Sequence, residues 1–199
     1  MLLTHLIYTG ILSLFVSLPS AAPQALTYDV IVHNRPVGQL NVSKASTETG
    51  IHYRVDADVS VHLLGEKRMV TRFTSTYRNN VLVEASFTDK LNGRTRHDAQ
   101  IRWNGSSYVI RINDAHSTLT DRRATYSTAS LYDREPVGVR ELFSERYGQF
   151  CALKTTADHT YELTLPDGKK NYYRYVNGRC HEVEVQQPLF TVFFRLRHD

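Results

Sequence analysis

The amino-acid sequence predicts an all-β, mainly antiparallel fold, a meander of strands that curls into a barrel or half-barrel. Apolar and polar side chains alternate over long stretches, most clearly through residues 51–63, where every second residue is apolar. Turn-forming pairs such as Asn92-Gly93 and Asn104-Gly105 separate these stretches. No helical periodicity is long enough to supply the crossovers of a parallel sheet. Because each strand twists relative to the last, a long antiparallel meander tends to curl.

Strands are expected wherever the two-residue alternation persists between turn signals. In the first half of the chain these are residues 26–34, 38–46, 51–63, 68–78, 81–91, 96–103 and 108–112. Pro36 and Gly38 mark the first reversal, because proline fixes φ and glycine permits a tight turn. In the second half the expected strands are residues 150–156, 159–165, 171–176, 179–187 and 189–197, with a turn at Asp167-Gly168.

One short helix is expected near residues 139–146. Val139, Leu142 and Phe143 follow each other at helical spacing, after the break made by Pro136 and Gly138. The segment has room for only about two turns at 3.6 residues per turn. The sequence therefore predicts a minor helical element inside an otherwise β domain.

The first 25 residues have the pattern of a signal peptide. Residues 6–18 are apolar, and small residues and prolines follow them. That run is shorter than the roughly 20 residues of a membrane span. We expect cleavage between Ser20 and Leu26, a single β-barrel-like domain over residues 26–199, a periplasmic or secreted location, and no integral membrane span after cleavage. A retained anchor is the alternative, since no Lys or Arg precedes the apolar run.

Charge and composition exclude one class of partner. The 199-residue chain has a net charge of +4 and 22% charged residues. A modest basic excess gives weak attraction to anionic surfaces. It is not the concentrated basic stripe that nucleic-acid-binding proteins carry. We therefore expect no nucleic-acid partner.

The chain has two cysteines, Cys151 and Cys180. In an oxidising compartment, two cysteines most simply form one disulfide. The closed loop of about 30 residues would stabilise the fold by roughly 3–4 kcal/mol. Two unpaired, buried thiols in neighbouring strands are the alternative, and a catalytic cysteine with His159 or His181 as its base is a weaker one.

Few residues form a pattern with chemical meaning. The common hydrolase, zinc and phosphate-binding motifs are missing from the sequence. His52 and His62 share one strand face, but ten residues of strand span roughly 33 Å, too far for one metal ion. Glu135 and Glu145 are either an acid/base pair at a cleft or ordinary ion-pair partners, and Ser144 is either a nucleophile or a turn residue. We expect no metal, no cofactor and no enzymatic activity.

Aromatic side chains on the inward register of successive strands are the candidate ligand-binding residues. They are Tyr53, Phe73, Tyr77, Phe87, Trp103 and Tyr108. One interpretation is that these rings fill the core. The other is that a large curved sheet leaves an apolar cavity, which the rings line and in which the tyrosine hydroxyls orient a ligand.

Several short motifs resemble one family of exported bacterial proteins, the domain of unknown function 6134. They are LYDREPVG at 131–138, LFSERYG at 142–148, YEL at 161–163, LPDG at 165–168, YRYVNG at 173–178, YDV at 28–30 and PVG at 36–38. The resemblance covers nearly the whole chain after the leader and implies a secreted or periplasmic, mostly β, barrel-like domain with no assigned activity. The chain departs from the expected pattern at Asp133-Arg134, where an aromatic residue is expected after Tyr132.

These observations favour a non-enzymatic function. More distantly, such domains are similar to the half-barrels that carry lipids or lipoproteins across the periplasm, a likeness of fold alone. We expect an exported protein that binds or carries a hydrophobic ligand, such as a lipid or acyl chain, or an envelope lipoprotein. The alternative is a structural or interaction module of the cell envelope without a ligand. A hydrolase or isomerase that uses Glu135 or Glu145 is the third possibility.

Overall fold

The computed structural model describes residues 24–62 and 65–197. The predicted signal peptide lies outside the described residues, apart from the last two residues of its range. Within the described ranges the elements are β1 Gln24–Val32, β2 Arg35–Thr47, β3 Gly50–His62, β4 Glu66–Arg78, β5 Val81–Leu91, β6 Arg94–Trp103, β7 Ser107–Ile112, β8 Ala115–Thr120, η1 Ala129–Tyr132, β9 Glu141–Ser144, β10 Gln149–Ala157, β11 Thr160–Thr164, β12 Lys170–Val176, β13 Arg179–Gln186 and β14 Thr191–Leu196.

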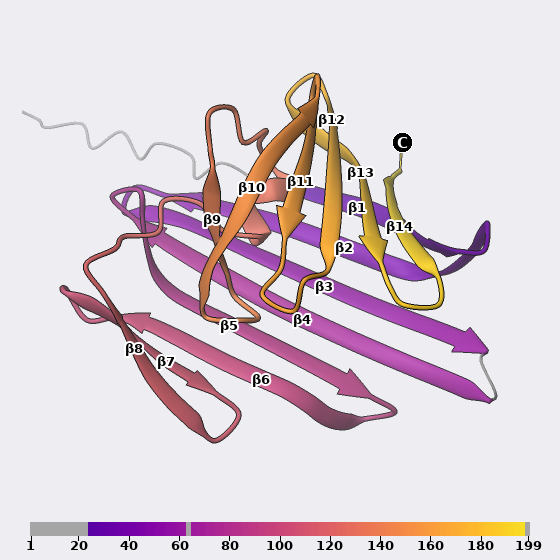
Figure 1. Ribbon diagram of the computed structural model, residues 1–199, viewed down its shortest axis with the longest axis horizontal. Helices are drawn as coiled ribbons and strands as arrows, with labels where there is room; N and C mark the ends of the chain where they lie inside the picture. Colours follow the sequence, from indigo (N-terminus) through magenta and orange to yellow (C-terminus); the bar gives the residue numbers. More distant parts are fainter. Residues whose placement is uncertain (1–23, 63–64, 198–199) are drawn as a thin grey trace, which may run out of the picture.

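These strands form one curved antiparallel sheet. Its order is β8-β7-β6-β5-β4-β3-β2-β1-β14-β13-β12-β11-β10-β9. The first and last strands pair with each other, as in Val30 opposite Phe194, so strands β9–β14 fold back over the long strands β1–β6 (Figure 1). The two edge strands, β8 and β9, are not hydrogen-bonded to each other. The all-β antiparallel prediction is confirmed, and the sheet is a half-barrel because it does not close.

The alternation in the sequence explains which face of the sheet is buried. In β3, Tyr53 and Val55 are buried, whereas Arg54 between them is exposed. The outward face carries ion pairs, among them Asp56 with Arg72 across the β3–β4 pairing and with Arg54 within β3. Opposite charges on facing positions stabilise the pairing of neighbouring strands. The inward face is the hydrophobic core.

The chain between β8 and β9, residues 121–140, passes through the interior, and we call it the internal segment. Its short 3-10 helix η1 packs against β3, β4 and β13, between the two halves of the sheet (Figure 1). Ala124, Ala129 and Leu131 are 0% exposed. Leu82 donates a backbone hydrogen bond of 2.8 Å to Ala124. Polar backbone in a core must be hydrogen-bonded, and these bonds let an irregular segment fill much of the half-barrel.

The prediction of a helix near residues 139–146 is wrong. Residues 141–144 form strand β9, in which Leu142 lies opposite Cys151 and Phe143 opposite Phe150 of β10. Leu142 and Phe143 are both 0% exposed, although they point to opposite faces of the strand. The internal segment pairs with the edge of β9 that faces away from β10, with Thr128 donating a 3.1 Å hydrogen bond to the Phe143 carbonyl. Burial on both faces gave an apolar pattern that also fits a helix.

The predicted disulfide is also wrong. Cys151 and Cys180 are free, buried thiols. Cys151 lies on β10 and Cys180 on β13, and β11 and β12 separate these strands. Three strand spacings of about 4.8 Å place the two backbones roughly 14 Å apart, whereas a disulfide needs Cα atoms within about 7 Å.

Candidate functional site

A buried carboxylate anchors the internal segment. Glu145 follows β9 and is 0% exposed. Its Oε1 accepts hydrogen bonds from the Ser75 hydroxyl at 2.5 Å and from the Ala129 amide at 3.0 Å, and its Oε2 accepts one from the Thr128 hydroxyl. The carboxylate therefore ties the start of η1 to β4 and to the turn after β9. Its burial and its three donors make Glu145 an anchor of the fold rather than a group that faces a cleft.

The other residues with predicted chemistry are also held by neighbours. The Glu135 carboxylate accepts a hydrogen bond of 2.8 Å from the Tyr161 hydroxyl and lies 2.9 Å from Nδ1 of His159. Ser144 is 2% exposed on the inner side of β9. Glu135 and Glu145 thus bind different neighbours, and these two carboxylates and Ser144 do not form one catalytic site.

The Asp133-Arg134 departure from the family pattern has a clear structural place. The Asp133 carboxylate lies 2.7 Å from Nζ of Lys44 and accepts a 2.9 Å hydrogen bond from the Tyr53 hydroxyl. Burial, together with the Asp133 carboxylate, raises the pKa of Tyr53 above its usual value. The Arg134 guanidinium lies over the ring of Tyr126, with Cζ 4.2 Å from the ring centroid. Asp133 thus fixes the internal segment to β2 and β3, whereas Arg134 packs on another residue of the internal segment itself.

The six aromatic residues predicted to line a site lie on one inner wall as three neighbouring pairs. Their ring centroids are 6.0 Å apart for Tyr53 and Tyr77, 6.1 Å for Phe73 and Phe87, and 4.8 Å for Trp103 and Tyr108. The members that are at most 6% exposed are Tyr53, Tyr77, Phe87 and Tyr108. These four rings are packed into the core, whereas Phe73 and Trp103 are half-buried.

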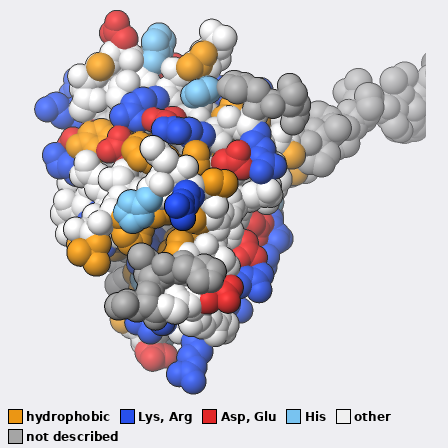
Figure 2. Space-filling view, turned by 90° about the vertical axis from the view of Figure 1, so that its right-hand side faces the viewer, with side chains coloured by type: hydrophobic (Ala, Val, Ile, Leu, Met, Phe, Trp, Pro, Cys, Tyr) orange, Lys and Arg blue, Asp and Glu red, His pale blue; other side chains and the backbone are white. Residues whose placement is uncertain are grey.

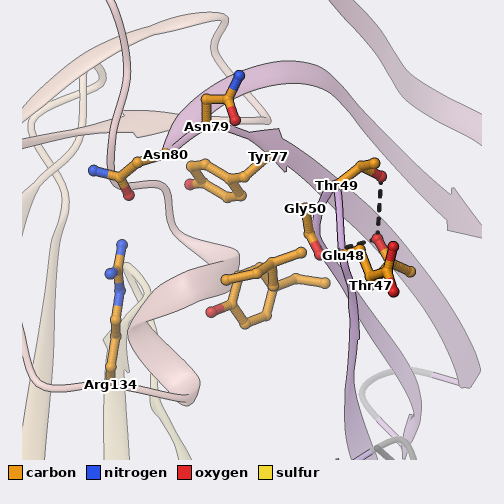
Figure 3. A pocket seen from close by; sticks show the side chains of 10 residues that line it. Thr47, Glu48, Thr49, Gly50, Tyr77, Asn79, Asn80 and Arg134 are labelled. Atoms are coloured by element: carbon orange, nitrogen blue, oxygen red, sulfur yellow. Dashed lines mark hydrogen bonds between the residues drawn. The ribbon is translucent and has the colours of Figure 1, made fainter. Parts of the chain in front are cut away.

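One end of the row opens into a pocket of about 300 Å³, which we call the Arg134 pocket (Figure 3). Its walls come from the β2–β3 and β4–β5 turns and from the internal segment. The lining residues are Thr47, Glu48, Thr49, Gly50, Ile51, Tyr53, Tyr77, Asn79, Asn80 and Arg134. The Tyr53 and Tyr77 rings meet edge to face at 90°. The pocket therefore has aromatic and apolar walls with one guanidinium at its side.

The opposite end of the half-barrel is incompletely covered, and we call it the open end. Strands β3 and β4 have 13 residues each, whereas β11 and β12 have 5 and 7, so the long strands extend past the shorter half (Figure 1). Met69 lies opposite Val59 on the inward face, yet it is 42% exposed. Val61 and Phe73, on the same face, are half-buried. Figure 2 views this end and shows hydrophobic side chains gathered across its middle.

The rim of the open end carries polar groups. Nε2 of His97 donates a 2.8 Å hydrogen bond to the Arg146 carbonyl. The Arg146 guanidinium lies over the ring of Phe87, with Cζ 5.3 Å from its centroid. Asp89, opposite His97, accepts a 3.0 Å hydrogen bond from the Thr71 hydroxyl. The open end is therefore an apolar surface with a short polar border.

Sequence reasoning missed the residues that distinguish the two ends. Arg134 was noted only as a departure from the family pattern, and Met69 was covered only by the expected strand at residues 68–78. A signal for Met69 was present, because residues 51–63 and 68–78 are longer than any strand expected in the second half. Nothing in the sequence shows that Arg134 reaches a pocket between two distant turns.

The described residues contain neither a metal-binding cluster nor a membrane-spanning helix. No group of three or more His, Cys, Asp and Glu side chains in residues 24–62 and 65–197 is placed to hold a metal ion. In the same ranges, no helix has the length and hydrophobicity needed to cross a bilayer.

Comparison with solved structures finds the same fold in another protein. The chain is similar to a crystal structure described as a beta-barrel-like protein of domain of unknown function DUF1849 from Brucella abortus. The two have a TM-score of 0.55 and 12% sequence identity, over 88% of this chain and 95% of the other. This likeness shows the barrel-like fold alone.

Comparison with curated protein sequences finds no match. The sequence profile of the domain of unknown function DUF6134 matches residues 28–197, from the middle of β1 to just beyond β14. This range contains strands β2–β14, the second half of β1 and the internal segment, and the predicted family resemblance is confirmed. The chain therefore belongs to the DUF6134 family.

Proposed function

We propose that this protein is a non-enzymatic, exported binding protein that takes up one apolar chain, such as the acyl chain of a lipid, at its open end. The observation that carries the proposal is Met69, which lies on the inward face and is still 42% exposed. Inward apolar side chains of a half-barrel are normally covered by the opposite wall. An apolar ligand would complete that cover.

The neighbouring side chains suit a chain-like ligand. Val59 is 8% exposed and Phe87 is 6% exposed, whereas Val61 and Phe73 beside them are half-buried. The surface thus runs inward from Met69 to the stacked Phe73 and Phe87 rings, where the internal segment blocks it through Tyr132, 6.5 Å from Phe73. An apolar surface that ends at a buried ring suits the end of an alkyl chain better than a whole lipid.

Native mass spectrometry of the protein purified from the bacterial envelope, without detergent, tests this function. We expect added mass that matches a molecule with an alkyl chain. In parallel, the uncharged dye N-phenyl-1-naphthylamine should become fluorescent with the purified protein and be displaced by 1-octanol. A protein without added mass, which also leaves the dye dark, contradicts the proposal.

A matched pair of variants locates the site. Met69→Asp places a charge on the open end and should weaken dye binding at least tenfold. Val109→Asp is the control, because Val109 is 47% exposed on the outward face of β7, between the buried residues Tyr108 and Ile110. Equal dye binding by both variants contradicts a site at Met69.

A ligand-free structural or interaction module is the second candidate. It is favoured by the internal segment, which fills the interior with residues such as Leu131 and Tyr132, at 0% and 4% exposed. Such a module should show no added mass in the native spectrum. It should instead co-purify with an envelope protein in a defined stoichiometry.

A further inference from the structure

We propose that the Arg134 pocket binds a small organic carboxylate with a planar, apolar body. The pocket lies at the β2–β3 and β4–β5 turns, whereas the open end lies at the β3–β4 turn, so the two sites are at opposite ends of β3 and β4. The inference is independent of the proposed function. It starts from the charges of three consecutive residues, Asp133, Arg134 and Glu135.

Both acidic neighbours of Arg134 are already engaged. Asp133 is bound by Lys44 and Tyr53 on one side, and Glu135 by His159 and Tyr161 on the other. Among the described residues, no carboxylate lies within ion-pair distance of the Arg134 guanidinium. The positive charge of Arg134 is therefore left for the pocket.

The guanidinium is also held in position. Its Nη2 donates a 3.0 Å hydrogen bond to the Thr125 carbonyl, and its plane lies over Tyr126. The Tyr126 hydroxyl in turn donates a 2.6 Å hydrogen bond to the Arg134 carbonyl. A fixed guanidinium loses little conformational entropy on binding, and its remaining N–H groups match the two oxygens of a carboxylate.

The pocket walls suit a planar apolar body. Tyr53 and Tyr77 present rings at a right angle, and Ile51 lies beside them. An aromatic ligand gains from edge-to-face contact with such rings. A volume of about 300 Å³ is at the lower end of the range for small-molecule sites, which favours a single-ring ligand over a lipid.

The other polar groups of the pocket limit the charge of the ligand. The Asn79 and Asn80 amides and the Thr47 and Thr49 hydroxyls border it (Figure 3). Glu48 adds an exposed carboxylate at the same border. One guanidinium opposed by one rim carboxylate suits a monoanion better than a dianion.

Benzoate and its uncharged analogue benzamide are the probes for this site. Titration of the ¹⁵N-labelled protein with benzoate should shift the amide signals of Gly50, Asn79, Asn80 and Arg134. Benzamide should bind at least tenfold more weakly, since it cannot pair with the guanidinium. Equal binding of the two, or shifts confined to other regions, overturns the proposal.

Variants separate this site from general surface charge. Arg134→Gln should weaken benzoate binding at least tenfold, whereas Arg94→Gln should leave it unchanged, because Arg94 is the first residue of β6, at the end of the sheet opposite the pocket. Glu48→Gln removes the carboxylate at the border of the pocket and should strengthen benzoate binding about threefold. Because Glu48 is exposed, this variant replaces Arg134→Gln as the test if Arg134→Gln does not fold. Unchanged binding in both pocket variants overturns the assignment. The octanol and dye tests of the open end should be the same in both pocket variants as in the unchanged protein, so the two proposals fail separately.

Discussion

The Ser75 hydroxyl of β4 donates a 2.5 Å hydrogen bond to the buried carboxylate of Glu145, 70 residues further along the chain. This bond joins the long half of the sheet to the end of β9, and the Ala129 amide on the same carboxylate adds the internal segment. One side chain thus connects three parts of the fold that are distant in sequence. Loss of the Glu145 charge should therefore weaken the fold.

Glu145→Gln should lower the free energy of unfolding by about 2–3 kcal/mol. Glutamine keeps the size of the side chain but removes its charge. It also places an amide N–H₂ group where hydroxyl donors converge. Charge-assisted hydrogen bonds in a core contribute about 2–3 kcal/mol, so the expected loss is of that size. Urea unfolding followed by circular dichroism measures the loss. Glu84→Gln is the control, because the Glu84 side chain is 59% exposed in its ion pair with Arg102. Equal stability of the two variants contradicts an anchoring role for Glu145.

Gly148→Ala should destabilise the protein more than an ordinary turn glycine does. Gly148 has φ +61°, and a Cβ there would lie 2.6 Å from Cγ2 of Ile110. Gly178 has φ +75° with open space around it, so Gly178→Ala should cost only about 1 kcal/mol for the backbone. The clash should add about 1–3 kcal/mol. Thermal unfolding of both variants compares the costs, and equal losses contradict close packing of this turn on β7.

The two cysteines should be inert in the folded protein. Burial, reinforced by the Glu145 carboxylate, raises the pKa of Cys151 to about 11, and burial raises the pKa of Cys180 further. Thiolate is the reactive form, so both thiols should react with Ellman's reagent only after unfolding. A reducing agent should not change the melting temperature. Fewer than two thiols per unfolded chain would reveal a disulfide and contradict the strand order.

Alkaline pH should unfold the protein. Burial and the hydrogen bond to Glu135 raise the pKa of Tyr161 to about 12, and burial also raises the pKa of Tyr28 and Tyr77. A pKa raised in the folded state stabilises the fold below the unfolded pKa, and this stability is lost as pH rises through the folded pKa. With unfolded values near 8.5 for Cys and 10 for Tyr, the loss should begin near pH 9.

Cys151 alone should account for a loss of about 3 kcal/mol by pH 11, from its folded pKa of about 11. Urea unfolding at pH 8, 9.5 and 11 measures the trend. Absorbance at 295 nm should show tyrosinate forming together with unfolding. Constant stability over this range contradicts the burial of these groups.

The sequence predicted the β architecture because alternation and turn chemistry are local. Residues 51–63 alternate without interruption, and β3 has that alternation with its inward residues buried. Strands β8 and β9 were missed for local reasons as well. β8 is largely exposed on the sheet edge and carries little apolar pattern, and Leu142 and Phe143 of β9 are buried on two faces.

The candidate site was harder to predict because it depends on pairing across the whole chain. The inward register of Tyr53 and Tyr77 followed from alternation, but the internal segment that covers them did not. Glu145 was interpreted as a cleft or surface residue, since a fully buried carboxylate is rare unless distant donors such as Ser75 reach it. The prediction of a disulfide was wrong for the same reason, because the strand order decides which cysteines are close in space.

A methyl NMR titration of Met69 tests the proposed binding at the open end most directly. The chain has two methionines, Met1 and Met69, so ¹³C-methyl labelling of methionine gives a nearly unique reporter at the open end. Titration with 1-hexanol, 1-heptanol and 1-octanol should shift the Met69 signal saturably. The affinity should rise about fourfold per added methylene, since each buried CH₂ contributes about 0.8 kcal/mol. A Met69 signal that stays fixed, or an affinity independent of chain length, would contradict an apolar-chain site there.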